Sequence, residues 1–266
     1  MKIGSIASGS DGNCIYVGSE QTNLLVDTGI SGVRIRKGLE EYGLTMEEIH
    51  GILITHEHID HIKGLGVLSR KYHIPIYATQ GTIHAIQKKK SVGKIENILF
   101  RNIEKEEHFL IGDIEVYALP ISHDAADPVA FRMEGEGKKI AIVTDLGYYD
   151  KRMIEQLQGL DVILLESNHE ETLVEVSSYP YELKMRVLGK QGHLSNANAG
   201  RFLREILHPN MQKIILGHLS NENNMPHLAY ETVRLELTMS QTHKEGMEYP
   251  LMVAKRSSVT EIIELL

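Results

Sequence analysis

Cysteine is almost absent from this chain of 266 residues, because Cys14 is its single cysteine. An intrachain disulfide is therefore impossible, and a reducing compartment is favoured. Any metal site must also use histidine, aspartate or glutamate rather than several thiolates. The chain has no run of about 18 apolar residues, the length needed to span a membrane. Residues 1–10 are too polar for the apolar part of a signal peptide. These absences predict a cytoplasmic protein that has no membrane partner.

Positive charge is scarce as well. The chain has 28 Lys and Arg against 36 Asp and Glu, a formal net charge of −8, which argues against a general binder of polyanions. Bound metal is omitted from that sum, however, and divalent ions would make one place strongly positive. Basic runs occur at Arg34–Lys37 and Lys88–Lys90, and we interpret both as solvated helix faces rather than nucleic-acid contacts. Net charge therefore leaves the class of substrate open.

Long linkers, low-complexity tracts and strong repeats are also missing, and residues 1–266 are therefore predicted to form one domain. Short apolar strands alternate with amphipathic helices along the whole chain. Hairpin turns at Asp11–Asn13 and Gly18–Asn23 come first, and strand–helix units follow. This mixture predicts an α/β protein with two packed mixed sheets and outer helices, a four-layer αββα sandwich.

The expected strands are Lys2–Ala7, Cys14–Val17, Leu24–Val26, Gly51–Ile54, Ile76–Ala78, Glu115–Leu119, Ala130–Met133, Lys139–Val143, Val162–Leu165, Lys213–Leu216 and Leu251–Ala254. The expected helices are Gly32–Tyr42, Ile62–Tyr72, Gln80–Lys89, Lys151–Gln158, Leu183–Leu188, Ala197–Leu207 and Ala229–Leu237. Functional side chains in such layered folds collect where strands end and loops begin.

The most informative stretch of the chain follows the expected strand Gly51–Ile54. It contains His56, His58, Asp60 and His61 within six residues. Two histidines that are two residues apart on extended backbone can converge on one ion, and the acid and histidine at the mouth of the next helix can face a second ion. A helix N-terminus also favours anions. A metal site is the favoured interpretation of this turn.

Three further residues that could bind metal follow expected strands, and these are His123, Asp145 and His218. Taken singly, each histidine is more often an ordinary loop residue, and the aspartate is more often a helix cap. Their joint occurrence after strands, with the dense cluster earlier in the chain, favours ligands instead. Seven side chains of the types that bind divalent metal are therefore expected to meet.

The order His56-x-His58-x-Asp60-His61, followed by His123, Asp145 and His218, resembles the metallo-β-lactamase fold superfamily. Val26-Asp27-Thr28-Gly29 is similar to that superfamily's early strand-end aspartate. Within the superfamily the chain most resembles the YycJ (WalJ) group of hydrolases. The segments that carry this second resemblance are Ala7–Asn13, Glu166–His169, Gly192–Asn196 and Leu216–Ser220.

The resemblance implies two divalent metal ions, zinc or manganese, with iron as a further option. It implies that His56, His58 and His123 bind one ion. It implies that Asp60, His61 and His218 bind the other, and that Asp145 bridges the two. Members of the superfamily that open β-lactams usually have cysteine where Asp145 stands. An antibiotic-degrading role is therefore not expected.

A pair of divalent ions about 3.5–4 Å apart can activate water as hydroxide and stabilise an oxyanion. Asp60 is expected to orient the hydroxide and take part in moving its proton. His193 is expected to protonate the leaving alkoxide, although a capping or supporting role also fits its place before an expected helix. Ser195 and Asn196 could contact a phosphate or simply cap that helix.

Two substrate-binding predictions stay open at this point. His169 fits a substrate contact and an ordinary surface histidine equally well. Ser8, Ser10 and Asn13 lie in a small, backbone-rich loop that fits a phosphate cradle and a tight hairpin turn about equally. The loop lacks the lysine of a nucleotide triphosphate-binding loop, so ATP hydrolysis is not expected.

The favoured function is hydrolysis of phosphodiesters by a dinuclear metal enzyme, and specifically a nuclease. The resemblance implies 5′-to-3′ exonuclease action on DNA, so DNA is favoured over RNA as the partner. RNA processing and cleavage of a cyclic phosphodiester are alternatives. Thioester or lactone hydrolysis and a metal-dependent regulator without enzyme activity are more distant ones. Protein partners are not predicted.

Overall fold

The computed structural model describes residues 1–239 and 248–266, which form two compact units. The first unit consists of residues 1–120, 125–138 and 255–266. The second consists of residues 121–124 and 139–254. The expectation of a single domain over residues 1–266 stays a prediction. No helix in the described parts of the chain is long and apolar enough to cross a membrane.

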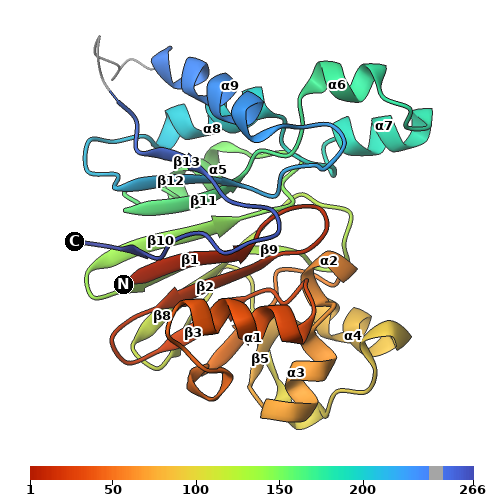
Figure 1. The fold of residues 1–266 in the computed structure, drawn as a ribbon, viewed down its shortest axis with the longest axis vertical. Coiled ribbons are helices and arrows are strands. Elements are labelled where there is room, and N and C mark those ends of the chain that lie inside the picture. Colours follow the sequence, from red (N-terminus) through yellow and green to blue (C-terminus); the bar gives the residue numbers. More distant parts are fainter. Residues whose placement is uncertain (240–247) are drawn as a thin grey trace. The chain divides into compact units, whose positions relative to one another are not determined.

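The first unit contains a mixed sheet with the strand order β14-β1-β2-β3-β4-β5-β6 (Figure 1). Pairing is antiparallel from β14 to β3 and parallel from β3 to β6. In chain order these strands are β1 (Lys2–Ala7), β2 (Cys14–Gly18), β3 (Asn23–Val26), β4 (Gly51–Leu53), β5 (Ile76–Thr79), β6 (Phe100–Ile103) and β14 (Ile263–Glu264).

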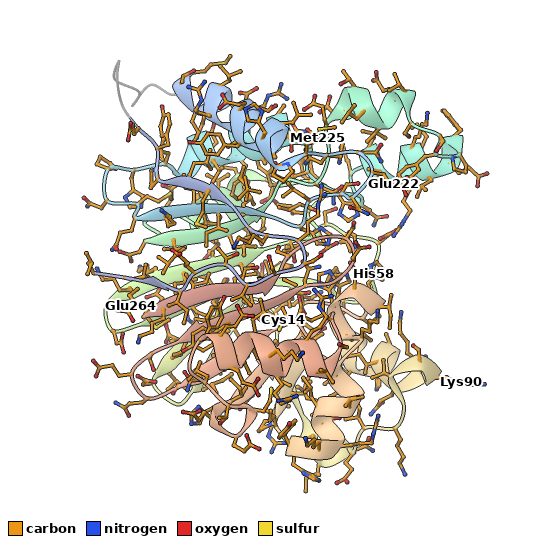
Figure 2. The ribbon with its side chains drawn as sticks, in the orientation of Figure 1. Cys14, His58, Lys90, Glu222, Met225 and Glu264 are labelled. Atoms are coloured by element: carbon orange, nitrogen blue, oxygen red, sulfur yellow. The ribbon has the colours of Figure 1, made fainter. Side chains whose placement is uncertain are left out.

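Helices pack on this sheet and bury their apolar stripes against it. They are α1 (Gly32–Glu41), α2 (Ile59–Ile62), α3 (Leu65–Tyr72) and α4 (Gln80–Lys88). Helix α1 begins at the cap Ser31, whose side chain accepts from the backbone N–H of Arg34, and it buries Ile35 and Leu39. Cys14 is buried in the same core (Figure 2), and burial raises the pKa of its thiol.

The remaining strands of the first unit form an antiparallel meander of β7 (His108–Ile111), β8 (Ile114–Pro120) and β9 (Val129–Gly135). The sequence analysis missed β7, and it also missed β6. Strand β6 is short and exposes the polar Arg101 and Asn102, so it lacks the apolar pattern from which strands were predicted. Strand β7 has three consecutive apolar residues, Phe109–Ile111, so its pattern was present and was overlooked.

The second unit contains four parallel strands, β10 (Lys138–Val143, of which Lys138 belongs to the first unit), β11 (Val162–Glu166), β12 (Lys213–Gly217) and β13 (Leu251–Val253). Its helices are α5 (Lys151–Gln156), α6 (Glu171–Val176), α7 (Tyr181–Leu188), α8 (Asn196–Ile206) and α9 (Pro226–Thr238). Strands β10 to β12 are almost continuously apolar and buried, as expected for parallel strands covered on both faces.

The single helix predicted over Ile62–Tyr72 is wrong, because the chain breaks after α2 and restarts as α3. Gly64 at the break donates its N–H to the carbonyl of Thr28 at 2.8 Å. A Cβ at this position would lie 2.4 Å from the carbonyl oxygen of Ile30. The close approach of these two backbone segments therefore requires glycine and interrupts the helix.

Candidate metal centre and proton donor

The first unit brings together the four residues of the histidine-rich turn. His56 follows β4 and is wholly buried, and its ring centroid lies 4.2 Å from that of His61 and 4.6 Å from that of His58. His58 caps α2, and Asp60 and His61 lie within that helix. The side chain of Asp60 is 23% exposed, and its Oδ2 lies 3.4 Å from Nε2 of His61. Three imidazoles and a carboxylate thus share one turn.

A buried aspartate at the end of β3 holds this turn in place. Asp27 accepts hydrogen bonds from the backbone N–H of Thr55 at 2.9 Å, from the Thr55 hydroxyl at 2.8 Å and from Nδ1 of His61 at 2.7 Å. Because the single hydroxyl proton of Thr55 goes to Asp27, Oγ1 of Thr55 accepts from Nδ1 of His56 at 3.0 Å. The network fixes the orientation of both rings through Nδ1, so Nε2 is the ring nitrogen that could bind a metal ion.

Gly29 is the point where the β3 loop touches this turn. A Cβ there would lie 1.5 Å from the carbonyl oxygen of Asp60 and 2.7 Å from the backbone nitrogen of Asn13. Gly29→Ala is therefore expected to lower the free energy of unfolding by about 1–3 kcal/mol, because backbone must move to accept the methyl group. Denaturant titration followed by circular dichroism measures this change.

Gly32→Ala is the matched control. The nearest atom to a Cβ at Gly32 is a methyl carbon of Leu68 at 3.3 Å, and alanine suits the first turn of α1 better than glycine does. The control is expected to change stability by less than about 1 kcal/mol. Equal stability of the two variants would mean that the contact between Gly29 and Asp60 is not tight.

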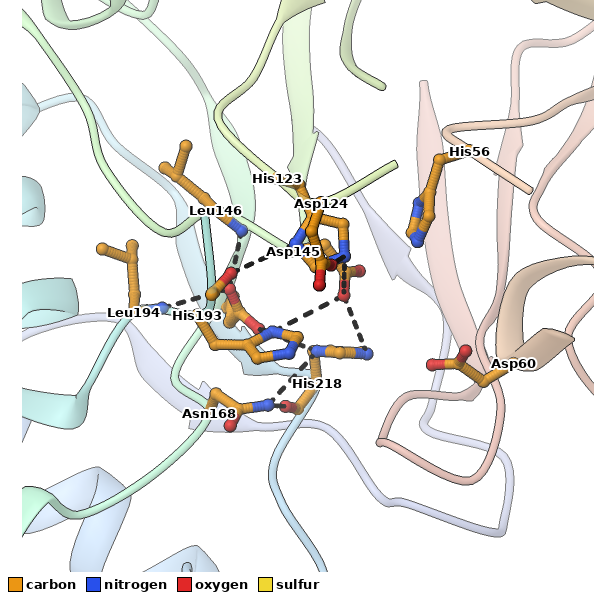
Figure 3. A network of polar contacts seen from close by, with 12 residues as sticks. His56, Asp60, His123, Asp124, Asp145, Leu146, Asn168, His193, Leu194 and His218 are labelled. Atoms are coloured by element: carbon orange, nitrogen blue, oxygen red, sulfur yellow. Dashed lines mark hydrogen bonds and ion pairs between the residues drawn. The ribbon is translucent and has the colours of Figure 1, made fainter. Parts of the chain in front are cut away.

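The second unit brings together three side chains at the ends of its parallel strands and a fourth, His193, from the segment before α8. One ligand atom from each of Asp145, Glu166, His193 and His218 lies within 4.8 Å of the other three. Figure 3 shows His193 and His218 pointing toward Asp145. Oδ1 of Asp145 lies 3.5 Å from Nδ1 of His193 and 3.6 Å from Nε2 of His218. Nε2 of His123 is also 3.6 Å from this oxygen. Asp145 is therefore the hub of the cluster.

Both units show the same hydrogen-bonding pattern on their histidines. Histidines that bind metal through Nε2 usually donate Nδ1–H to a carboxylate or carbonyl, which fixes the tautomer. The Nδ1 partners are Thr55 for His56, Asp27 for His61, the carbonyl of Gly192 for His123 and Glu166 for His218. Each ring is thus oriented through its Nδ1 contact, and imidazole together with carboxylate is a ligand set that fits zinc or a similar divalent ion.

Glu166 is a functional residue that the sequence analysis did not assign. It is wholly buried, and its Oε1 accepts from Nδ1 of His193 at 2.7 Å and from Nδ1 of His218 at 2.8 Å. Burial would raise its pKa, but the charges and hydrogen bonds of the two histidines lower the pKa to about 2. Glu166 could have been found from its position at the end of β11. The other acids and histidines at strand ends were predicted as site residues on that basis.

The Glu166 carboxylate also sets the direction in which the pKa of His193 is shifted. Burial would lower the pKa of His193, but the charge of Glu166 outweighs this effect and raises that pKa above the ordinary histidine value. The side chain remains 16% exposed, whereas His218 is 1% exposed. His193 is therefore a partly accessible imidazole at the edge of a buried cluster, and Glu166 favours its protonated form. These are the properties expected of a general acid.

Three of the strand-end residues adopt left-handed backbone, namely Asp27 (φ 61°), Asp145 (φ 57°) and His218 (φ 53°). This conformation is uncommon outside glycine and costs free energy that the surrounding structure must supply. Aspartate and histidine tolerate it better than most residues. The turn at each strand end therefore points a polar side chain in a direction that ordinary strand geometry does not allow.

The predicted substrate contacts of the first unit lie in the hairpin between β1 and β2. Ser8 and Asn13 are buried and Ser10 is exposed. Asn13 closes the turn by exchanging hydrogen bonds with the backbone of Gly9 at 3.1 Å, and its Nδ2 is 3.3 Å from Nε2 of His61. The tight-turn interpretation is therefore confirmed, and Ser10 is the exposed member of the three.

The predicted substrate contacts of the second unit are all buried. His169 is 0% exposed, so its interpretation as a surface histidine is wrong, and burial lowers its pKa to about 4. Ser195 caps α8 by accepting from the N–H of Asn198, as one of the two readings predicted. Asn196 donates to Glu170 at 3.2 Å and accepts from the hydroxyl of Ser167 at 2.6 Å. Its amide thus belongs to a buried network.

The family model of the beta-lactamase superfamily domain matches residues 22–218. The chain is 38% identical over 236 residues to exodeoxyribonuclease YycJ of Bacillus anthracis, with 86% of each chain covered. It is 36% identical over 265 residues to exodeoxyribonuclease WalJ of Streptococcus pneumoniae, and this match covers 100% of this chain and 98% of WalJ.

Solved structures agree on the fold. The crystal structure of Zn²⁺-bound PqqB from Methylobacterium extorquens superposes with a TM-score of 0.70 at 16% identity, and the match covers 98% of this chain and 100% of that one. The predicted α/β metallo-β-lactamase fold is therefore confirmed. The chain belongs to the beta-lactamase superfamily, in which it is a metal-dependent hydrolase of the YycJ group.

Proposed function

We propose that the protein is a phosphodiester hydrolase that acts on nucleic acid, and specifically a 5′-to-3′ exonuclease of DNA. The observation that carries this proposal is the pairing of His193 with Glu166, which orients an imidazole beside the buried Asp145 and His218 and favours its protonated form. Phosphodiester cleavage releases an alkoxide that needs such a proton. The full-length similarity to two exodeoxyribonucleases supports DNA as the substrate.

The proposal includes two divalent metal ions, zinc or manganese, with iron as a further option. One ion would be held by His56, His58 and His123. The other would be held by Asp60, His61 and His218, and Asp145 would bind both. When bound, such a pair makes water nucleophilic and stabilises negative charge on the phosphate oxygens. Support comes from the family and from the shared Nδ1 pattern of the histidines.

Proton transfer falls to residues of the chain itself. Asp60 would accept the proton of the attacking water, because its carboxylate is partly exposed on a turn of histidines. His193 would donate a proton to the leaving oxygen. Glu166 would hold the imidazole in one orientation and keep it charged, which makes it a positioning residue. Ser8, Ser10, Asn13, His169, Ser195 and Asn196 stay predictions as substrate contacts.

The decisive experiment incubates the purified protein with duplex DNA, single-stranded DNA and RNA of one sequence, each labelled at either the 5′ or the 3′ end. With Mn²⁺ or Zn²⁺ we expect mononucleotides to appear first from the 5′ end of DNA. Chelation and dialysis should reduce cleavage to background, and added metal should restore it, because the proposed chemistry depends on bound ions.

The product ladder separates the alternatives. Internal cuts in RNA would replace the proposal with RNA processing, and cleavage confined to a cyclic nucleotide would replace it with a small-molecule phosphodiesterase. Turnover that survives complete metal removal would contradict the proposed centre. Absence of turnover on every phosphodiester, with metal bound, would favour a thioester or lactone hydrolase or a regulator. We also propose a cytoplasmic location, because a single cysteine suits a reducing compartment.

A further inference from the structure

Positive charge is concentrated in one segment of this acidic protein. Residues 62–97 contain seven Lys and Arg and one acidic residue, Glu96, a net charge of +6 in a chain whose total is −8. We call the seven cations the cationic ridge. Its members are Lys63, Arg70, Lys71, Lys88, Lys89, Lys90 and Lys94. All are exposed except Lys89, which is half-buried.

None of the ridge cations forms an ion pair with a carboxylate of residues 1–239 or 248–266. Several surface cations outside the ridge are paired. Lys2 lies 3.0 Å from Glu264, Lys105 lies 2.5 Å from Asp127, and the Lys151–Glu155 pair is 3.9 Å long. A cluster of like charges without counter-charges repels itself and attracts anions. The ridge therefore has an electrostatic cost that binding of a polyanion would relieve.

The two halves of the ridge are tied into one surface. The guanidinium of Arg70 on α3 donates to the carbonyl of Val92 at 3.2 Å and to that of Lys94 at 3.1 Å. Gly66 of α3 approaches so closely that a Cβ there would lie 1.9 Å from the carbonyl oxygen of Val92. The segment Val92–Lys94 is therefore packed against α3. Figure 2 shows Lys90, just before it, projecting away from the protein.

Helix geometry does not account for the whole ridge. Arg70, Lys71 and Lys88 lie in the last turns of α3 and α4, where cations stabilise the negative end of a helix dipole. Helix α4 ends at Lys88 with Lys89 as its C-cap, however, and Lys90 begins a separate 3-10 helix over Lys90–Val92. The three lysines therefore do not share one helix face, as the sequence analysis had assumed.

The ridge begins beside the residues proposed to bind metal. Lys63 follows α2, which contains Asp60 and His61, and α3 carries the chain on to Arg70. Lys63 is therefore two residues from His61 in the sequence, and the ridge starts next to the turn that carries four of the proposed ligands.

We propose that the cationic ridge binds the phosphate backbone of nucleic acid and guides a strand toward the turn at His56–His61. The inference rests on the proposed function and deepens it, because it names the surface that recognises a polymeric substrate. Lysines that contact phosphates add affinity without reading sequence. The ridge should therefore matter for DNA and be irrelevant to a small phosphodiester.

The test compares two triple variants that remove the same charge. Lys88→Gln/Lys90→Gln/Lys94→Gln removes three unpaired cations of the ridge. Lys2→Gln/Lys105→Gln/Lys151→Gln removes three paired cations elsewhere. Binding is measured by fluorescence anisotropy on the metal-loaded full chain, with a labelled phosphorothioate DNA strand that resists cleavage, at several salt concentrations. Hydrolysis of bis(p-nitrophenyl) phosphate is measured in parallel.

The ridge variant is expected to bind DNA on the order of tenfold more weakly at about 0.1 M salt, and to lose about two to three from the slope of log K against log salt. The control variant should stay within about twofold of the parent chain. Equal losses in the two variants, or unchanged binding in the ridge variant, would overturn the proposal. So would loss of binding to phosphatidylglycerol vesicles with DNA binding intact, because the ridge would then be a membrane contact.

The parallel assay keeps the two proposals apart. If the ridge variant still hydrolyses bis(p-nitrophenyl) phosphate normally and DNA binding is unchanged, the ridge proposal fails and the proposed function stands. If the parent chain binds DNA through the ridge but hydrolyses no phosphodiester, the proposed function fails. Because the phosphorothioate strand is not cleaved, binding can be measured in either case.

Discussion

Replacing Asp60 with alanine is expected to reduce phosphodiester turnover by at least about a thousandfold while the protein stays folded. The side chain is partly exposed, and its Oδ2 lies 3.4 Å from Nε2 of His61 in a turn held by Asp27. Loss of a general base alone costs about 10²- to 10⁴-fold, and loss of a metal ligand adds to this. Turnover of bis(p-nitrophenyl) phosphate with excess Mn²⁺ measures the effect.

Asp11→Ala is the matched control, because it removes an exposed aspartate from the same unit. It should leave turnover and metal content unchanged. Elemental analysis and the thermal unfolding midpoint of both variants show whether Asp60→Ala has lost metal or has lost its fold. Full activity of a folded Asp60→Ala protein would be incompatible with the proposed role of the turn.

Replacing His193 with alanine is expected to separate substrates by their leaving groups. DNA releases an alkoxide that needs a proton, so its cleavage should fall by about 10²- to 10⁴-fold. Nitrophenolate leaves without protonation, so turnover of bis(p-nitrophenyl) phosphate should fall by less than about tenfold. The parent chain should also lose DNA cleavage as the pH rises through the pKa of His193, which Glu166 raises. That loss should disappear in the variant.

His208→Ala is the control for this experiment, since His208 belongs to the same unit and its side chain, among the described residues, contacts just the carbonyl of Leu160, at 2.8 Å. Both variants should retain metal, because His193 is not among the proposed ligands. An equal decrease on the two substrates would instead assign a structural role to His193. Unchanged activity on DNA would contradict the proposed role of His193 as the proton donor.

Much of the fold was predictable because its central strands are simple. Strands β10, β11 and β12 are buried, almost continuous apolar segments, and each was predicted within one residue at either end. Edge elements were less predictable. Strand β6 exposes Arg101, and nothing in the local pattern distinguishes it from a loop. The break at Gly64 was not predictable either, because it depends on the distant backbone at Ile30.

The site was predictable where one short stretch of sequence carries the whole signal. The spacing of His56, His58, Asp60 and His61 was visible in the sequence, and the structure places them on one turn. Glu166 was missed because its role depends on pairing with two histidines far along the chain. His169 was ambiguous for a related reason. Burial is a property of the folded chain, and a lone histidine carries no pattern that reports it.

The interleaving of the two compact units has a consequence for dissecting the protein. The chain passes from the first unit to the second at residue 121 and back at residue 125. It passes to the second unit again at residue 139 and returns to the first at residue 255. The first unit needs β9 to pair with β8 and the late strand β14 to pair with β1. No single truncation can therefore deliver either half intact. Split-protein or domain-transplant designs would have to join three separate pieces of sequence for the first unit and two for the second.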